Sequence, residues 1–333
     1  VRTPASYKED PDLAWLKGMD SLALANVQQN FQRAVKEFFS GEKGCPRFKK
    51  KHACPDTYTT NLSNRDKPNL RLSGCLLKLP KIKGPVRLRV HRKVREGGLL
   101  KNCTVTREPD GRWYFSLLFE YPKQEIPKKT AGKGPEAWEA IGLDMSLPEL
   151  YVDSDSSTPA YLKPYRKLER KIAQEQRKLS RMEKDSRNYT KQLGKIAKLH
   201  AKAKHQRADF LHKLSYRLVT HYDIICIEDL DMSAIKKALS FGKSASDNGW
   251  GMFVRMLTYK AEWYGSILIK AGKFFPSSKA CCACGHVHKE LKLSDRVYVC
   301  PACGHVMGRD HQAAVNIRNE GVRIYIAAHS HVA

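Results

Sequence analysis

The spacing of apolar residues changes several times along the chain, and each change predicts a different kind of structure. Apolar positions three to four residues apart indicate an amphipathic helix, whereas short apolar or alternating runs between Gly and Pro indicate strands. The helical spacing covers residues 1–40, 163–220 (as two or three helices in a hairpin), 250–264 and 310–321. Strand-like runs fall within 55–125 and at 140–144, 150–153, 224–228 and 267–269. This mixture predicts an α+β protein with more than one domain.

Two stretches between these elements have no such pattern. Residues 122–137 are rich in Pro, Gly and Lys and predict a linker, and residues 229–249 predict a mobile loop. Within 55–125, the tripeptide Pro109-Asp-Gly111 predicts a hairpin turn, so this region is expected to be a small antiparallel barrel or sheet.

The charge of the chain indicates the kind of partner. Its 60 Lys and Arg against 34 Asp and Glu give a net charge of +26. Such a surplus repels itself unless a polyanion neutralises it, which favours nucleic acid as the partner over a merely basic, soluble surface. Between residues 163 and 213 there are 17 Lys and Arg and 5 Asp and Glu. This density indicates a surface that follows a nucleic-acid backbone, the alternative being a solvated helix surface.

The composition also indicates where in the cell the protein is expected to be found. No run of about 18 apolar residues is present, so we expect no membrane span, and no signal peptide is visible. The ten cysteines do not form a disulfide framework, which indicates a reducing, intracellular setting. We expect a cytoplasmic, nucleoid-associated protein of a prokaryote. The chain starts at Val1 rather than Met, and we expect its natural N-terminus to be missing.

Four cysteines have the spacing of a metal site, Cys-x2-Cys-x15-Cys-x2-Cys; they are Cys281, Cys284, Cys300 and Cys303. Four thiolates suit tetrahedral Zn²⁺ and leave no open position, so the predicted site is structural; the alternative is coincidence or a disulfide. Gly285 and Gly304 follow the two pairs and permit tight turns. We take Cys282 as a spare cysteine, and His286 and His305 as surface residues rather than ligands.

Three acidic residues carry the predicted catalytic chemistry. Asp144 and Glu228 end predicted strands, and Asp310 begins a predicted helix. Each acid alone is more typical of plain surface. Two carboxylates at neighbouring strand ends and one from a facing helix can hold two Mg²⁺ ions about 4 Å apart for phosphodiester hydrolysis. The order of these elements is that of an RNase H-like fold.

Several motifs together resemble the transposon-encoded TnpB family, relatives of the type V CRISPR effector nucleases. The motifs lie at 141–144, 227–230, 239–251, 277–281 and 309–317, with a looser match at 47–51. The resemblance implies an RNA-guided DNA endonuclease with a guide RNA and a double-stranded DNA target, in which guide pairing supplies most of the specificity.

The resemblance also implies a division of the chain into domains. These are a helical recognition part (1–46), a wedge-like β-barrel (47–130), the first part of a RuvC-like nuclease (138–276), a zinc ribbon (277–307) and the last nuclease helix (308–325). We expect nucleic acid to contact Arg47, Lys49, Lys50, Lys51, Arg170, Lys171, Arg177 and Lys178.

The last motif departs from the family pattern at two positions. Gly308 replaces an acid, and Gln312 replaces a shorter amide. A change of this kind beside a metal ligand can weaken metal geometry. One alternative function, a nuclease-silent, RNA-guided DNA-binding repressor, therefore stays open. A second alternative is an RNA-independent transposase, which would join DNA strands through the same three acids. The resemblance further predicts that the first wedge strand and part of the recognition helices precede Val1.

Overall fold

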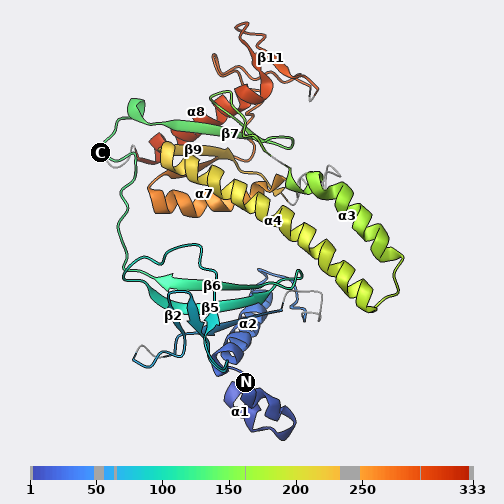
Figure 1. Cartoon of the computed structure of the whole chain (residues 1–333). Helices are drawn as coiled ribbons and strands as arrows, with labels where there is room; N and C mark the ends of the chain where they lie inside the picture. Colours follow the sequence, from blue (N-terminus) through green and yellow to red (C-terminus); the bar gives the residue numbers. More distant parts are fainter. Residues whose placement is uncertain are drawn as a thin grey trace. The chain divides into compact units, whose positions relative to one another are not determined.

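The chain consists of two compact units, Val1–Gln124 and Glu125–Ala333. The computed structural model describes residues 3–48, 56–63, 66–161, 163–232, 248–292 and 294–329 (Figure 1). Both units combine helices and strands, which confirms the predicted α+β class. The boundary between the units falls inside the stretch 122–137.

The predicted helical region at the start of the first unit is broken into three pieces. These are α1 (Pro4–Glu9), a 3-10 helix (Pro11–Gly18) and α2 (Ser21–Phe39). Asp10 and Asp20 cause the breaks, because each side chain accepts a hydrogen bond from the backbone amide two residues ahead and so caps a new helix.

The strands of the first unit form two three-stranded sheets. One has the order β1 (Asp56–Asn61), β5 (Leu99–Arg107), β6 (Trp113–Glu120), and the other has β2 (Arg71–Ser73), β3 (Leu76–Lys78), β4 (Val86–Arg87). The predicted turn is confirmed, since the Gly111 amide donates to the Glu108 carbonyl at 2.9 Å and Gly111 has a φ of +84°. A single apolar core, which includes Leu77 and Cys103, is shared by the strands of both sheets.

Strand β1 lies inside the region 55–125 that was predicted to be a sheet, but no apolar run of its own marks it. Its sequence is Asp-Thr-Tyr-Thr-Thr-Asn, and it is held by cross-strand pairs of threonine hydroxyls. Thr57 pairs with Thr106 at 3.1 Å, and Thr59 pairs with Thr104 at 2.8 Å. Such polar β-branched pairs stabilise the strand, and Tyr58 of β1 also packs against the core.

The second unit is built on a four-stranded sheet of order β10 (Ile267–Ala271), β9 (Ile224–Glu228), β7 (Ala140–Ser146), β8 (Leu150–Asp153). Strands β7 and β8 form an antiparallel hairpin, whereas β9 is parallel to both β7 and β10. All four strands were predicted, but β7 runs two residues beyond Asp144, so the prediction that Asp144 ends its strand is wrong. Pairing with β8, in which Ser146 faces Leu150, extends the strand.

Helices cover both faces of this sheet. Helix α8 (Arg309–His329) lies on one face, and α4 (Arg187–His221) and α7 (Trp250–Tyr264) lie on the other (Figure 1). Successive side chains of β9 alternate between the two layers: Ile225 and Ile227 pack in the α4 and α7 core, and Ile224 and Cys226 pack against α8. This double burial explains why the strand reads as a continuous apolar run.

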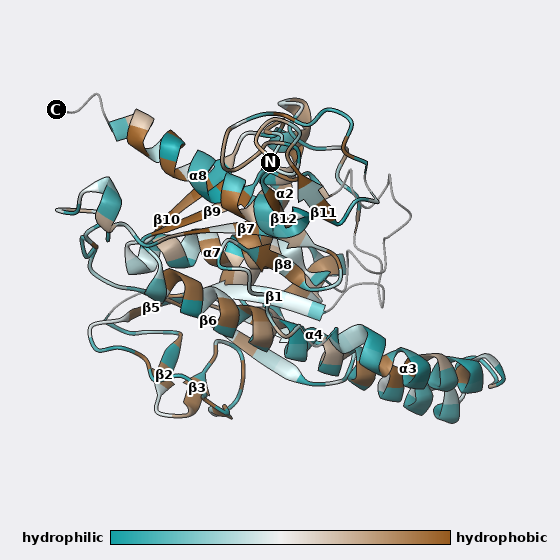
Figure 2. Ribbon diagram, turned by 90° about the horizontal axis from the view of Figure 1, so that it is seen from above, coloured by the Kyte–Doolittle hydropathy of each residue, from teal (hydrophilic) through white to brown (hydrophobic). Residues whose placement is uncertain are grey.

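The long helical region is a hairpin of two helices, α3 (Pro164–Ser180) and α4. Ser186 begins α4 by accepting a hydrogen bond from the Tyr189 amide at 3.1 Å. Helix α3 and the adjoining part of α4 are mostly hydrophilic (Figure 2). Of the predicted loop at 229–249, residues 233–247 lie outside the described residues. No helix in the described part of the chain is long and apolar enough to cross a membrane.

Candidate active site and metal centre

The topology brings the three predicted carboxylates onto one face of the sheet. Strands β7 and β9 run side by side with Leu143 opposite Ile227, so the next residues, Asp144 and Glu228, follow at the same level. Leu143 and Ile227 belong to the core under α4 and α7. Because side chains alternate along a strand, the two carboxylates point to the opposite face, which α8 covers. Asp310 stands in the first turn of α8.

Helix α8 can lie close to the strands because glycines occupy two contact positions. A Cβ atom on Gly142 of β7 would collide with the Ala314 carbonyl oxygen and the Arg318 amide of α8. On the helix side, a Cβ atom on Gly321 would collide with the Cys226 thiol of β9. This close approach brings the start of α8 to the ends of β7 and β9, and with it Asp310.

The electrostatics of Asp144 show that the three acids interact. Desolvation, together with the charges of Glu228 and Asp310, raises the pKa of Asp144 to about 8 against the opposing effect of Arg309. A buried carboxylate that faces two others is unfavourable on its own and is stabilised by a bound cation. The chemistry of the donor set, three carboxylates supplied by two strands and a helix, suits a hard divalent cation such as Mg²⁺.

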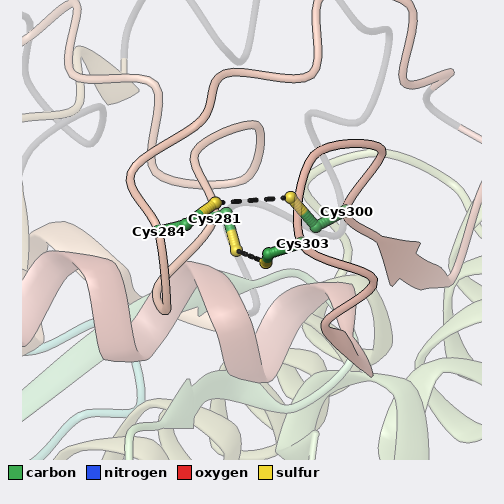
Figure 3. A group of neighbouring side chains, drawn as sticks. All are labelled: Cys281, Cys284, Cys300 and Cys303. Carbon is green, nitrogen blue, oxygen red and sulfur yellow. Dashed lines mark hydrogen bonds between the residues drawn. The ribbon is translucent and has the colours of Figure 1, made fainter.

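The four predicted zinc ligands form one cluster. Their Sγ atoms all lie within 4.8 Å of one another, and among the described residues this is the one group of three or more His, Cys, Asp and Glu that lies so close. The Sγ atoms of Cys281 and Cys303 are 3.7 Å apart, and those of Cys284 and Cys300 are 3.5 Å apart (Figure 3). A tetrahedron with Zn–S bonds of about 2.3 Å has edges of about 3.8 Å, so the cluster could hold zinc.

The turns around the cluster present amide groups to the sulfur atoms. Gly285 and Gly304 have φ values of +75° and +72°, the left-handed conformation that glycine adopts without strain. Desolvation opposes ionisation of Cys300, but hydrogen bonds from the Cys303 and Ala302 amides and from neighbouring thiols lower its pKa to about 6. The thiolate that a metal requires is thus favoured at this position.

Cys282 and His305 lie beside the cluster and contact each other. The Cys282 Sγ atom is 3.3 Å from His305 Nε2, and His305 is half-buried. Neither belongs to the four-cysteine group, while His286 is exposed. The spacing rule therefore gave the four cysteines that cluster, but it missed the contact between the spare cysteine and the histidine.

The segment that leads into the cluster links it to the carboxylates. Ser277 is buried, and its hydroxyl donates a hydrogen bond to Glu228 Oε1 at 2.6 Å. From α8, Gln312 Nε2 donates to the Ala280 carbonyl at 2.8 Å, and Asn316 Nδ2 donates to the carbonyls of Ser277 and Ala280, both at 2.7 Å. The unusual Gln312 therefore contacts the backbone directly before the four-cysteine cluster.

Gly308, the other departure from the family motif, is the last residue of β12 (Val306–Gly308), which pairs with β11 (Val297–Val299). Gly308 is exposed, and a Cβ atom added to it would meet nothing within 4 Å. Space therefore does not require glycine at this position.

Five of the eight residues predicted to contact nucleic acid lie in the described part of the chain. Arg47 is exposed, whereas Lys49, Lys50 and Lys51 lie outside the described residues. On α3, all four predicted cations, Arg170, Lys171, Arg177 and Lys178, are exposed. Lys178 also forms an ion pair with Glu175 at 2.7 Å, which reduces the charge that it offers to a partner.

A second cationic segment was missed by the sequence prediction. Residues 81–95 contain seven Lys and Arg and no Asp or Glu, and all seven are exposed. Only Val86–Arg87 of this segment is a strand. A simple count of charge along the chain would have found it.

Comparison with protein families gives two matches that together cover most of the second unit. Residues 119–239 match a family described as "Probable transposase". Residues 250–317 match a family described as "Cas12f1-like, TNB domain", and these residues include the four cysteines and Asp310.

Individual relatives match most of the chain. It is 34% identical over 318 residues to a candidate RNA-guided DNA endonuclease of Streptomyces pristinaespiralis, covering 95% of this chain and 75% of the relative. It is 31% identical over 330 residues to a candidate RNA-guided DNA endonuclease, InsQ, of Escherichia coli K12, covering 95% and 78%. The fold is similar to that of the protein in a cryo-EM structure of a Cas12f1–sgRNA–target DNA complex, with a TM-score of 0.54, 14% identity, and coverage of 90% of this chain and 71% of that one.

Proposed function

The chain belongs to the TnpB family, and we propose on this basis that it is an RNA-guided DNA endonuclease in which Asp144, Glu228 and Asp310 cleave the target. The observation that carries the proposal is that desolvation, together with the charges of Glu228 and Asp310, raises the pKa of Asp144 to about 8. An exposed acid without charged neighbours would keep an ordinary pKa. The relatives that are named as candidate RNA-guided DNA endonucleases, of which this chain covers 75% and 78%, support the same activity.

We also propose that the second unit is a RuvC-like nuclease with an RNase H-like sheet. The antiparallel pair β7 and β8, followed by the parallel strands β9 and β10, supports this assignment. The nuclease spans 138–276 and 308–325 and is interrupted by a zinc ribbon at 277–307. In the first unit, the core shared by two sheets supports a wedge-like barrel at 47–130, which follows a helical part at 1–46.

The protein residues have distinct tasks in the proposed reaction. Asp144, Glu228 and Asp310 would hold two Mg²⁺ ions, which supply an activated water and stabilise the leaving oxygen when bound. Asp144 would hold the cation as a carboxylate, with its proton released to solvent, because a positive charge at the site offsets the repulsion from the other two acids. The ribbon cysteines would hold a structural zinc ion.

Guide RNA and target DNA are the proposed partners. The exposed cations of α3 and of residues 81–95 would contact phosphates, which position a nucleic acid without reading its sequence. Pairing between guide and target would supply most of the sequence specificity.

The test begins with sequencing of the RNA that copurifies with the chain. The RNA-loaded protein is then incubated with a matched DNA duplex and Mg²⁺, beside an Asp144→Ala variant and a related active protein. We expect the wild-type chain and the related protein to cleave the matched duplex, and Asp144→Ala to leave it intact. Absence of cleavage while the related protein cuts refutes the proposal.

A nuclease-silent DNA-binding protein is the second candidate, and the altered positions Gly308 and Gln312 favour it. This function predicts guided DNA binding that is the same in the wild-type chain and in Asp144→Ala. A purified chain that carries no RNA would instead favour the RNA-independent transposase.

A further inference from the structure

Ser277 connects the ribbon to the candidate catalytic site by a single short hydrogen bond. Its hydroxyl lies 2.6 Å from Glu228 Oε1, and Ser277 itself is only 7% exposed. A glutamate has three rotatable side-chain bonds, so a fixed partner on one oxygen restricts its orientation and leaves the other oxygen available to a cation.

The backbone around Ser277 is itself held in place. It belongs to a tight turn in which the amides of Lys279 and Ala280 donate to the Pro276 carbonyl at 3.0 and 2.9 Å. Asn316 binds the carbonyls at both ends of Ser277–Ala280, and Gln312 adds a second donor to Ala280. Asn316 and Gln312 are both buried, so water cannot readily replace them.

This turn is continuous with the zinc site. Cys281 follows Ala280 directly, and Ala280 pairs with Val287 in an isolated bridge across the first cysteine turn. Because only the turn Ser277–Ala280 separates Ser277 from Cys281, the backbone position of Ser277 depends on that of the four-cysteine cluster. Helix α8 binds the same turn and carries Asp310. It therefore positions Asp310 directly and Glu228 through Ser277.

We propose that Ser277 is a positioning residue for Glu228, and that the turn Ser277–Ala280 makes the orientation of Glu228 depend on an intact zinc ribbon. The inference rests on the proposed function, since it assigns Glu228 to the binding of the catalytic cation. It gives the ribbon a direct part in organising the active site, beyond the stability that a structural metal supplies.

The first experiment measures Mn²⁺ affinity by electron paramagnetic resonance of the free ion, with the RNA-loaded chain as the sample. The signal from the Asp144→Ala complex is subtracted, because RNA also binds Mn²⁺. We expect Ser277→Ala to weaken the Asp144-dependent affinity about 10- to 100-fold, the usual effect of losing a partner of a metal ligand. Guided DNA binding is expected to stay at the wild-type level, which shows that the variant is folded.

Ser278→Ala is the matched control. It removes the same atom from the next residue, whose side chain makes no hydrogen bond in the described part of the chain. Wild-type Mn²⁺ affinity in Ser277→Ala overturns the inference, and so does an equal loss in both variants.

The second experiment tests the dependence on the ribbon. Cys303→Ser removes an exposed member of the cluster, and zinc content is measured alongside Mn²⁺ affinity. We expect a loss of zinc, a loss of Mn²⁺ affinity of the same order as in Ser277→Ala, and little further loss when the two changes are combined. Unchanged Mn²⁺ affinity in a zinc-free ribbon overturns this part.

These readouts separate the inference from the proposed function. A wild-type complex that binds Mn²⁺ through Asp144 but does not cleave DNA refutes the endonuclease. The effect of Ser277→Ala on affinity still decides the positioning role.

Discussion

Replacement of Asp144 by Asn is expected to stabilise the folded chain while it abolishes binding of the catalytic cation. In the folded chain, burial and the charges of Glu228 and Asp310 raise the pKa of Asp144 to about 8 from an ordinary value of 3.8. The free energy of unfolding therefore depends on pH through this residue. An amide of nearly the same shape carries no charge and removes that dependence.

The sign and size follow from the two pKa values. Below pH 3.8 the carboxyl group is protonated in both states and has no effect on stability. Between pH 3.8 and 8 the unfolded chain loses the proton and the folded chain keeps it, so stability falls by about 1.4 kcal/mol for each pH unit. The loss reaches at most about 4 kcal/mol at pH 7, and about a third of that at pH 5. Above pH 8 it no longer grows, because both states are ionised.

The assay is thermal unfolding of the RNA-free chain in Mg²⁺-free buffer from pH 5 to 9. We expect the melting temperature of Asp144→Asn to exceed that of the wild type by about 5–10 °C at pH 7, with a smaller gain at pH 5. Added Mg²⁺ should raise the melting temperature of the wild type and leave that of the variant unchanged.

Asp153→Asn is the control, because Asp153 is a buried acid whose oxygens are already satisfied by the Asp155 and Ser157 amides and the Ser157 hydroxyl. It is expected to destabilise the chain, since it replaces an acceptor with a donor. A gain for Asp144→Asn that is absent, or that is the same from pH 5 to pH 8, would refute the reasoning.

Three further changes test other parts of the structure. A strong zinc chelator should remove one zinc ion per chain, measured by a colorimetric zinc assay. Loss of the ion should unfold the ribbon, measured by circular dichroism. Gly142→Ala should destabilise the second unit by about 3 kcal/mol in denaturant unfolding, since the new Cβ meets the backbone of α8, whereas Gly251→Ala, with open space around it, should have little effect. Substitution of Arg170 and Lys171 by Gln should weaken RNA binding and lower the slope of log affinity against log salt by about 1–2; an unchanged slope would show that α3 makes no phosphate contact.

Much of the second unit could be predicted from the sequence because its signals are local. Strand β9 is a continuous apolar run that ends at Glu228, and Trp250–Tyr264 is a helix with the predicted bounds. The four-cysteine spacing is equally local, since tetrahedral zinc accepts only a few chain geometries.

The first unit was predicted less well because several of its determinants are not patterns of apolar residues. Strand β1 is held by hydroxyl pairs with β5, which no pattern of apolar residues reveals. The helical region before it is divided by Asp10 and Asp20, whose capping role depends on the local backbone.

The sequence by itself determined the order of the acids, the cysteine spacing and the surplus of positive charge. Only the tertiary structure decided how these parts act together. The pKa of Asp144 depends on two residues that are 84 and 166 positions away along the chain, and the Ser277–Glu228 bond spans 49. Such contacts depend on the close packing of α8 against β7 and β9, which a one-dimensional pattern does not record because it is set by shape across the whole core.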